Sequence, residues 1–435
     1  DWSSDVCSSD LTNNDFFSFF GFQKICYRFS QKISKFFVYL IWINSPYVIC
    51  PKNIRRHKIY CMEKKVYYLE LLLDLATWII IPFINLYALH LGFSKFFIGS
   101  FNAILSLSYI ITFFVSFFLI NHERIKIAFS LASIIWGLSF ILLYYAKSES
   151  LFLIAVIMRA MSSPIISVSY TYIISKAFKE RTFDRVTNLS IIYASVGLFA
   201  TITSSFLIRE FSYPAIVFYL PFIFSILSVI IFNKIEIKDD NEIYQHDIVK
   251  EIRKSLKDEK LIRYAFMLFV FYFSVGIASP FFSVFLKEVV GKSEVEWAIY
   301  SSIELLSFLL FSSAIKRIGL KKEYTYPTLF FISTFFISLL PLIWVVSKSF
   351  EIIIFASFIS GIFWNLFQIT HLTYLTKTFS DIKKISFLGI FIGLGSAIGN
   401  VVGGLISQIS LEQAFYISFI FSLFSSYLFL HSMGL

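Results

Sequence analysis

The chain has 435 residues, of which 57% are hydrophobic and 20% aromatic, while only 15% are charged. Its mean hydropathy of +0.75 lies outside the usual range of soluble domains, so the composition excludes an ordinary water-soluble protein and predicts a lipid bilayer as its surroundings. The net charge of +10 does not indicate nucleic-acid binding, because the basic residues fall in short patches between apolar runs.

Residues 1–61 differ in character from the rest. They hold all the cysteines, which are Cys7, Cys26, Cys50 and Cys61. The opening run DWSSDVCSSDL resembles a translated sequencing adapter, and the first methionine is Met62. We therefore expect 1–61 to be artefact or untranslated upstream sequence without a packed structure, although the apolar stretch 36–50 also fits a short signal-peptide core or an interfacial helix. Without cysteines beyond this segment, neither a disulfide framework nor a thiolate metal site is expected, and no cofactor is predicted.

Twelve apolar runs follow, each long enough for a membrane-spanning helix. The first six lie near 66–91, 97–120, 125–146, 150–174, 187–208 and 213–233. The second six lie near 264–288, 297–315, 325–347, 351–375, 386–408 and 412–432. Because lipid cannot satisfy exposed backbone groups, all are predicted to be helices, which makes the chain an all-α integral membrane protein.

The longest connection divides the chain into 62–233, a linker at 234–263, and 264–435. Within the linker, apolar residues recur at near-helical spacing among lysines and glutamates: Ile248, Ile252, Leu256 and Leu261. This spacing predicts an amphipathic helix along the membrane surface, with a solvated linker as the alternative.

Lysine and arginine accumulate on one side of the predicted spans. With the start of the first span inside, the cytoplasmic loops hold twenty-one and the opposite loops hold six. Since basic residues collect on the cytoplasmic side, both termini are predicted to be cytoplasmic, in the inner (plasma) membrane.

The two halves repeat each other locally. Pro82 and Gly92 recur as Pro280 and Gly291, at offsets of 198 and 199 residues. A second match pairs Thr171, Tyr172, Lys176 and Phe178 with Thr373, Tyr374, Lys377 and Phe379. The third is the basic loop after the second span of each half, with Arg124 and Lys126 in the first copy and Arg317, Gly319, Lys321 and Lys322 in the second.

These loops resemble the G-x-x-x-D-R-x-G-R/K-K signature of the major facilitator superfamily, with the acid lost from the second copy and the glycine from the first. The resemblance covers 62–435 and leaves the subfamily open. It implies two six-helix bundles related by a pseudo-twofold axis, with spans one, four, seven and ten around a central cavity. We expect a monomer.

Polar side chains form stripes within these spans. An ionised group in a span costs at least about 2.5–3.5 kcal/mol, so one that is present usually faces a cavity or a partner. The predicted solute and proton cavity comprises Glu70, Asp74, Trp78 and Asn85 in span one; Arg159, Ser163 and Tyr170 in span four; Glu304 in span eight; and Trp364, Asn365, Gln368 and His371 in span ten.

The sequence thus predicts a secondary transporter that moves a small solute by alternating access, with protons as the coupling ion. In this hypothesis Asp74 takes up a proton and Arg159 holds either the carboxylate or an anionic solute, while a static buried ion pair is the alternative. No phosphate-binding loop for ATP occurs. A non-transporting sensor or scaffold with the same fold stays open, and a lipid-modifying enzyme is the weaker alternative.

Overall fold

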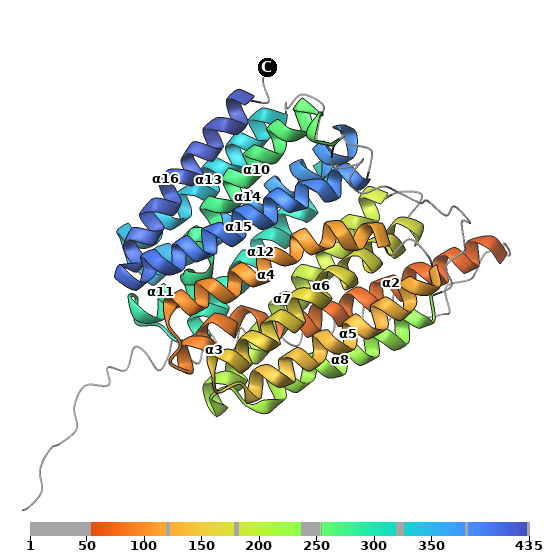
Figure 1. The fold of residues 1–435 in the computed structure, drawn as a ribbon, viewed down its shortest axis with the longest axis horizontal. Coiled ribbons are helices and arrows are strands. Elements are labelled where there is room, and N and C mark those ends of the chain that lie inside the picture. The colour runs from red at the N-terminus through yellow and green to blue at the C-terminus, as the bar shows by residue number, and fades with distance from the viewer. Residues whose placement is uncertain are drawn as a thin grey trace, which may run out of the picture. The chain divides into compact units, whose positions relative to one another are not determined.

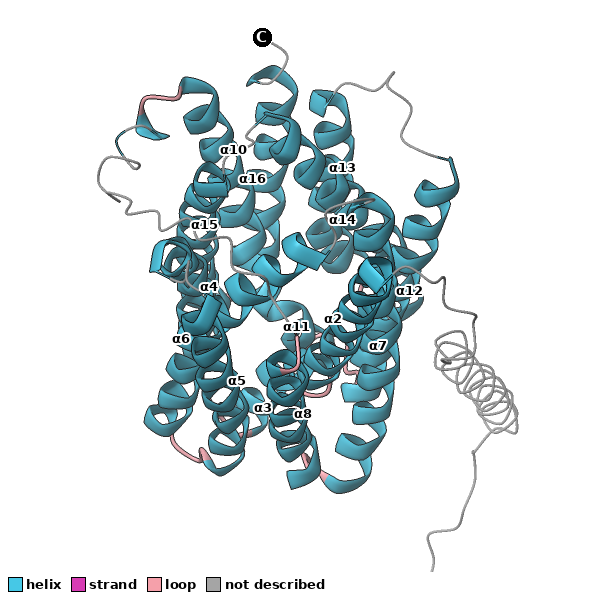
Figure 2. Cartoon of the chain, turned by 90° about the vertical axis from the view of Figure 1, so that its right-hand side faces the viewer, coloured by secondary structure: helices cyan, strands magenta, loops and turns pink. Residues whose placement is uncertain are grey.

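A computed structural model describes residues 54–435 apart from 119–121, 178–181, 236–252, 254, 319–325, 379–381 and 433–435. In these ranges the elements are helices joined by short turns, and none is a strand (Figure 2). The compact unit analysed below is Cys61–Leu435. Residues 1–53 lie outside the described residues, as do Ile248 and Ile252 of the predicted linker helix.

Twelve stretches of the described chain are long and apolar enough to cross a membrane, which confirms the predicted number of spans. In the first half they are built from α2 (Ile54–Trp78), η1 (Ile81–Phe83), α3 (Ile84–His90), α4 (Lys95–Phe118), α5 (His122–Tyr145), α6 (Glu149–Ala177), α7 (Thr182–Phe211) and α8 (Ala215–Asn233). In the second half they are built from α10 (Glu259–Ala278), η2 (Ser279–Phe281), α11 (Phe282–Glu288), α12 (Glu294–Ile318), α13 (Tyr326–Ser347), α14 (Phe350–Thr378), α15 (Ile382–Ile409) and α16 (Leu411–Ser432).

Spans one and seven are broken at corresponding positions. A proline in each, Pro82 or Pro280, lies in a 3-10 turn that separates a long helix from a short one. Proline lacks the N–H that would continue the α-helical ladder, so the helix is interrupted there. Each short helix is followed by a glycine with positive φ, +80° at Gly92 and +72° at Gly291, a backbone conformation that suits glycine. The repeat seen in the sequence is therefore also a repeat of backbone geometry.

Helix pairing shows the twofold relation between the halves. Within the first half α5 packs on α6 and α8, and within the second half α13 packs on α14 and α16 in the equivalent places. Between the halves, α4 packs on α15 and α12 packs on α7. In both pairs the second span of one half (α4 or α12) packs on the fifth span of the other half (α15 or α7), so the repeat converts one pair into the other. Figure 1 shows α4 in orange beside α15 in blue.

The contact of α4 with α15 depends on small residues. A Cβ on Gly99 would meet the Cα of Gly404 at 2.8 Å, and one on Gly393 would meet the carbonyl oxygen of Ser106 at 3.0 Å. The opposite face of α15 packs just as tightly on α10, where Gly276 lies 2.7 Å, measured from its ideal Cβ, from the carbonyl oxygen of Ser396. Small residues let helix backbones approach closely, so α15 contacts both halves of the molecule.

The two ends of the helices differ in how the core is divided. We call the end near Pro82 and Pro280 the proline end, and the end where α8 finishes and α10 begins the linker end. At the proline end one buried cluster includes side chains of both halves, such as Phe83 and Phe285. At the linker end there are two separate clusters, one around Phe129 of the first half and one around Phe330 of the second. The halves therefore share a core at the proline end only.

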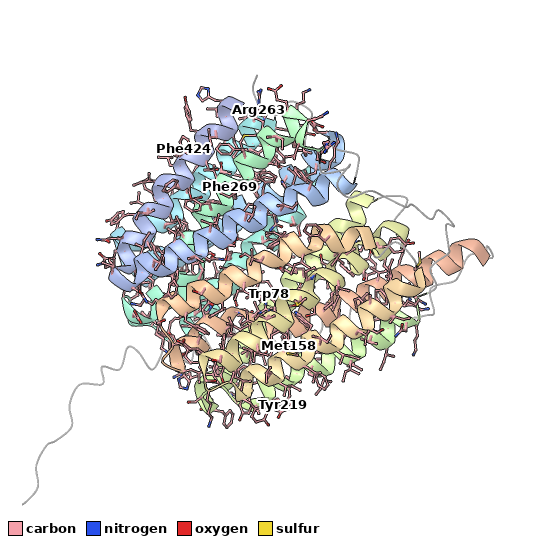
Figure 3. The ribbon with its side chains drawn as sticks, viewed as in Figure 1. Trp78, Met158, Tyr219, Arg263, Phe269 and Phe424 are labelled. Atoms are coloured by element: carbon pink, nitrogen blue, oxygen red, sulfur yellow. The ribbon has the colours of Figure 1, made fainter. Side chains whose placement is uncertain are left out.

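The outer surface of the spans is apolar. Large hydrophobic side chains are exposed on many of them, including Phe355 (66% exposed) and Phe424 (50% exposed). Phe424 points away from the bundle in Figure 3. A surface of this kind requires lipid around it, in agreement with the prediction from composition.

The tight contact between α10 and α15 predicts that alanine is tolerated very differently at two glycines. Gly276→Ala places a methyl group against backbone and should destabilise the protein by about 1–3 kcal/mol. Gly389→Ala is the matched control, because its Cβ meets nothing nearer than the carbonyl oxygen of Tyr109 at 3.4 Å. Thermal unfolding of the purified protein, followed by tryptophan fluorescence, checks this, and equal melting temperatures would contradict the packing.

The end of the linker is anchored by Asp258. Its carboxylate accepts the Leu261 N–H at 3.2 Å as the N-cap of α10, and Lys384 at the start of α15 donates to it at 2.5 Å. The hydrogen bond from Lys384, together with that from Leu261, holds the pKa of Asp258 below its usual value. The predicted linker residues Leu256 and Leu261 flank this cap; Leu256 is exposed, whereas Leu261 is fully buried in the core of α10.

Because the pKa of Asp258 is lower in the folded state, its contribution to stability is present above the ordinary carboxyl pKa of about 4 and is lost as the pH falls through the folded value. We expect Asp258→Asn to lower the melting temperature at pH 7. At a pH below the folded-state pKa of Asp258, where its carboxyl group is protonated, the substitution should have little effect. Lys384→Met should reproduce this pH dependence. A loss that is independent of pH in both variants would show that the ion pair is not responsible.

Candidate functional site

The centre of the candidate site is an acidic pair on span one. Glu70 and Asp74 lie four residues apart on α2, so both carboxylates point to the same face. Asp74 is only 7% exposed, and its Oδ2 has no hydrogen-bond partner among the described residues. The hydroxyl of Tyr170 on α6 lies beside Glu70 and within electrostatic range of Asp74. Spans one and four thus bring together three of the predicted residues.

Trp78 continues this face one turn further along α2 and is labelled near the middle of the molecule in Figure 3. Its ring packs edge-on against Tyr193 of α7 at a centroid distance of 5.3 Å, and its indole Nε1 is buried without a partner among the described residues. Tyr193 in turn contacts Phe308 of α12 at 6.5 Å and lies within electrostatic range of Asp74 and Glu304.

Tyr193 is absent from the predicted site residues. It lies within electrostatic range of the acidic pair of the first half and of Glu304 of the second half, whose Oε1 accepts a hydrogen bond from Ser360 at 3.1 Å. A tyrosine in an apolar run has no sequence signal that separates it from the other aromatic residues. Only the packing of α7 on α12 brings it to this position.

Arg159 lies apart from the acids. Its guanidinium stacks over the ring of Phe140 on α5, with Cζ 5.5 Å from the ring centroid, and its Nε is buried without a partner in the described chain. No ion pair between Arg159 and an acidic residue occurs among the described residues. This geometry does not support the static Asp74–Arg159 pair that the sequence left open as an alternative. Ser163, one turn further on, is half-buried.

The side chain of Asn85 bonds to two other spans at the proline end. Its Nδ2 donates to the carbonyl oxygen of Pro280 at 2.9 Å, and its Oδ1 accepts from Asn102 of α4 at 2.9 Å. The amide therefore joins spans one, two and seven at the proline end. Helical spacing from Asp74 and Trp78 predicts that Asn85 continues the polar stripe of span one, but the 3-10 turn at Pro82 interrupts that spacing.

Span ten supplies a mixed set of contacts. Asn365 is 1% exposed and donates to the carbonyl oxygen of Phe308 at 2.7 Å and to Ser312 at 2.6 Å, so its amide packs α14 against α12. The Nδ1 of His371 lies 2.5 Å from the Tyr264 hydroxyl, within the linker-end core of the second half. Trp364 is half-buried against Phe271, and Gln368 is exposed. Of these residues, Trp364 and Gln368 remain candidates for the cavity.

The basic loops are described only in part. Lys126 donates from Nζ to the carbonyl oxygen of Asn233 at 3.3 Å, and Lys65 donates to that of Lys234 at 2.5 Å. Both lysines thus cap the last carbonyl groups of α8, where a cation is favourable. The backbones of Arg124 and Arg317 are helical. Gly319, Lys321 and Lys322 lie outside the described residues.

The candidate site combines groups that can bind protons with groups that can donate to a polar ligand. It offers carboxylates, tyrosine hydroxyls, an indole N–H and a guanidinium, and among the described residues Asp74 Oδ2, Trp78 Nε1, Arg159 Nε and the Tyr170 hydroxyl are buried without a hydrogen-bond partner by distance and angle. Within the described ranges there is no cluster of three or more His, Cys, Asp or Glu side chains with the spacing of a metal site.

Comparison with known proteins agrees with this architecture. The sequence model of the Major Facilitator Superfamily matches residues 67–263 and 264–433. No curated protein matches the sequence. Among solved structures, the nucleoside transporter NupG is 13% identical with a TM-score of 0.66, covering 86% of this chain and 98% of NupG, and a point mutant of NupG gives 0.67, with 13% identity and coverage of 85% and 98%.

The human organic anion transporter MFSD10 (TETRAN) is also 13% identical, with a TM-score of 0.61 and coverage of 84% of this chain and 99% of that one. At such identities the likeness shows the fold and does not extend to the solute. The family match and these neighbours confirm the resemblance drawn from the loop motifs and the expectation of a non-enzymatic protein. The chain belongs to the Major Facilitator Superfamily and is a multi-pass membrane transporter.

Proposed function

We propose that this transporter is a proton-coupled secondary carrier that moves a small solute across the cytoplasmic membrane by alternating access, with Asp74 as the proton-binding group. The observation that carries the proposal is the burial of Asp74 without a full set of hydrogen-bond partners. It is more than nine-tenths buried, and one carboxylate oxygen has no partner in the described chain. A charge without a partner is expensive in such surroundings, whereas a neutral carboxylic acid is not.

The neighbours of Asp74 support a role in coupling. Glu70 lies one turn away and adds a second negative charge, so the two carboxylates disfavour simultaneous ionisation. Tyr170 provides a hydroxyl beside Glu70, and Tyr193 provides one within electrostatic range of Asp74 and Glu304. When water reaches this group, Asp74 releases its proton; when the helices close around it, the proton is retained. The protonation state thereby depends on which side of the membrane the site faces.

Arg159 is proposed as a separate solute-binding group. Its guanidinium has no acidic partner among the described residues and rests on the Phe140 ring, so an anionic or polar group of a solute can occupy it without first breaking an ion pair. Trp78 and Trp364 offer flat apolar surfaces in spans one and ten. This arrangement fits a small polar solute and leaves its identity to experiment.

The excess of lysine and arginine at the linker end supports an orientation with both termini in the cytoplasm of the inner (plasma) membrane. The proline end then faces outward. Since the halves share a core at the proline end and have separate cores at the linker end, the described conformation corresponds to a carrier closed on the outside. We propose that it functions as a monomer.

Proton binding by Asp74 is testable before the solute is known. We expect the infrared difference spectrum of the purified protein between pH 5 and pH 9 to contain a protonated-carboxyl band that is absent in Asp74→Asn. Asp258→Asn serves as the control, because Asp258 lies outside the spans and is paired with Lys384. If the band is unchanged in Asp74→Asn, Asp74 does not bind the proton.

Transport provides the second test of coupling. Proteoliposomes are screened for uptake of radiolabelled sugars, amino acids, nucleosides and organic anions under an imposed pH gradient. For the solute that accumulates, Asp74→Asn should abolish accumulation while exchange across the membrane continues, because the solute site remains. Accumulation that survives this change would rule out coupling through Asp74, and failure of every solute to enter would favour a non-transporting protein.

Orientation is tested by labelling single cysteines, since no cysteine follows Met62. In a background with the four earlier cysteines replaced by serine, a cysteine at Ser150 should react with a membrane-impermeant maleimide in intact cells. One at Lys257 should react only after permeabilisation. Both positions are exposed. The reverse pattern would overturn the assignment of the proline end to the outside.

A further inference from the structure

We propose that Asn85 and Trp297 form a reciprocal latch, two hydrogen bonds to the broken-helix carbonyls of the opposite half, which keeps the proline end closed and must open to admit solute from that side. The latch rests on the alternating-access part of the proposed function. In this proposal the two hydrogen bonds contribute to the free energy by which the closed form of the proline end is more stable than the open form.

The latch consists of two hydrogen bonds whose acceptors are related by the repeat and whose donors lie in different spans. Asn85 of the first half donates from Nδ2 to the carbonyl oxygen of Pro280 at 2.9 Å. Trp297 of the second half donates from Nε1 to the carbonyl oxygen of Pro82 at 2.7 Å. Pro82 and Pro280 are equivalent positions in the 3-10 turns of spans one and seven. Each half therefore offers one donor and one carbonyl, and receives the same from its partner half.

The broken helices explain why these carbonyls are available. A backbone carbonyl has two lone pairs, so the carbonyl of each proline can accept a side-chain donor in addition to any backbone bond, and hydrogen-bond geometry within a 3-10 turn is poorer than within an α-helix. The same interruption separates the short helices α3 and α11 from α2 and α10. The two acceptors of the latch thus belong to the prolines at which the spans are broken.

Each donor is oriented by its own half. Asn102 of α4 donates to Oδ1 of Asn85 at 2.9 Å, so that the Nδ2 of Asn85 is the atom that faces Pro280. The Asn102 amide also bonds to the carbonyl oxygen of Ile98 at 2.8 Å, which holds it on its own helix. The Trp297 ring stacks on Tyr300 at a centroid distance of 5.1 Å and an angle of 13°. When the halves separate, both donors keep these contacts and lose only the bond across the interface.

Other contacts across the interface at the proline end lie close to the latch. Lys95 pairs with Glu288 at 2.7 Å, and both side chains are partly exposed, so salt weakens this pair. Deeper along the interface, Asn400 of α15 donates to Ser106 of α4 at 2.9 Å and Ser106 also contacts Ser396 at 2.8 Å. These bonds lie on the tight α4–α15 contact. If the halves tilt about that contact, as alternating access requires, the proline end with the latch is displaced more than the contact itself.

The experiment measures the separation of the halves at the proline end. Spin labels are attached at Ser150 and Val346, exposed positions near the proline ends of the first and second halves, in the cysteine-free background of the full chain. Pulsed electron resonance then gives the distribution of distances between the labels. The latch variants are Trp297→Phe, which keeps a ring and removes the donor, and Asn85→Ala.

We expect each latch variant to increase the ratio of the long-distance to the short-distance population by roughly two- to tenfold, the factor that corresponds to one neutral hydrogen bond. The double variant should show a larger increase than either single variant. The matched controls are Asn365→Ala and Trp344→Phe, the same residue types with contacts inside the second half only. They should change the melting temperature and leave the distance ratio unchanged.

The latch is overturned if Trp297→Phe and Asn85→Ala leave the distribution as it is in the parent, or if the controls shift it equally. Should Asn85→Ala fail to fold, Asn85→Asp replaces it, since aspartate still accepts from Asn102 but has no amide donor. The control over the proposed function is a comparison between pH 5 and pH 9. If a second distance appears when the pH is changed but does not become more populated in the latch variants, alternating access is retained and the latch is rejected. If a single distance is found under all conditions, alternating access itself is rejected.

Discussion

The close approach of α4 and α15 is the contact on which the rest of the structure depends. In a bilayer there is no hydrophobic gain from burying one apolar helix against another, because lipid is equally apolar, so two bundles stay together through close packing and hydrogen bonds. Gly99, Gly393 and Gly404 allow the backbones to meet, and Ser106, Ser396 and Asn400 add polar contacts where the helices touch. The paired contact of α12 with α7 completes the interface by the same symmetry.

This interface also bears on the candidate site. Asp74 and Glu70 belong to the first half and Glu304 to the second, and Tyr193 of α7, which lies in the contact with α12, is within electrostatic range of all three. A side chain on a helix that faces lipid would be costly if charged, so the interior between the bundles is the place left for these acids. Among the described residues, Oδ2 of Asp74 and the indole nitrogen of Trp78 are buried there without a hydrogen-bond partner, which is the observation that the proposal of proton and solute binding uses.

The two ends of the molecule differ in how the halves meet. Both halves contribute to one buried cluster at the proline end, while each has its own cluster at the linker end. Among the described residues, the contacts across the proline end include neutral hydrogen bonds and a partly exposed ion pair between Lys95 and Glu288. Such contacts separate at a lower cost in free energy than a buried ion pair, whose separation leaves a charge uncompensated in the interior. The alternating access proposed above requires the halves to part at this end, and contacts of this kind allow it.

The sequence by itself determined the number of spans, their helical nature, the two halves and the family, because these follow from the length of apolar runs and from local motifs. It also predicted Glu70, Asp74 and Tyr170 as site residues, since spacings of about four residues place side chains on one face of a regular helix. Their part in transport stays a prediction. The sequence also grouped Asn85 with the polar stripe of span one on helical spacing. The 3-10 turn at Pro82 interrupts that spacing, and the sequence pattern did not reveal the turn. It missed Tyr193, and it did not reveal that Arg159 rests on Phe140 or that Asn365 is used in packing, because these are contacts between helices that are distant in the sequence. Only the tertiary structure decided those partners. Polar side chains can lie on any face of a helix, and the packing of neighbouring helices determines which of them make hydrogen bonds within the protein.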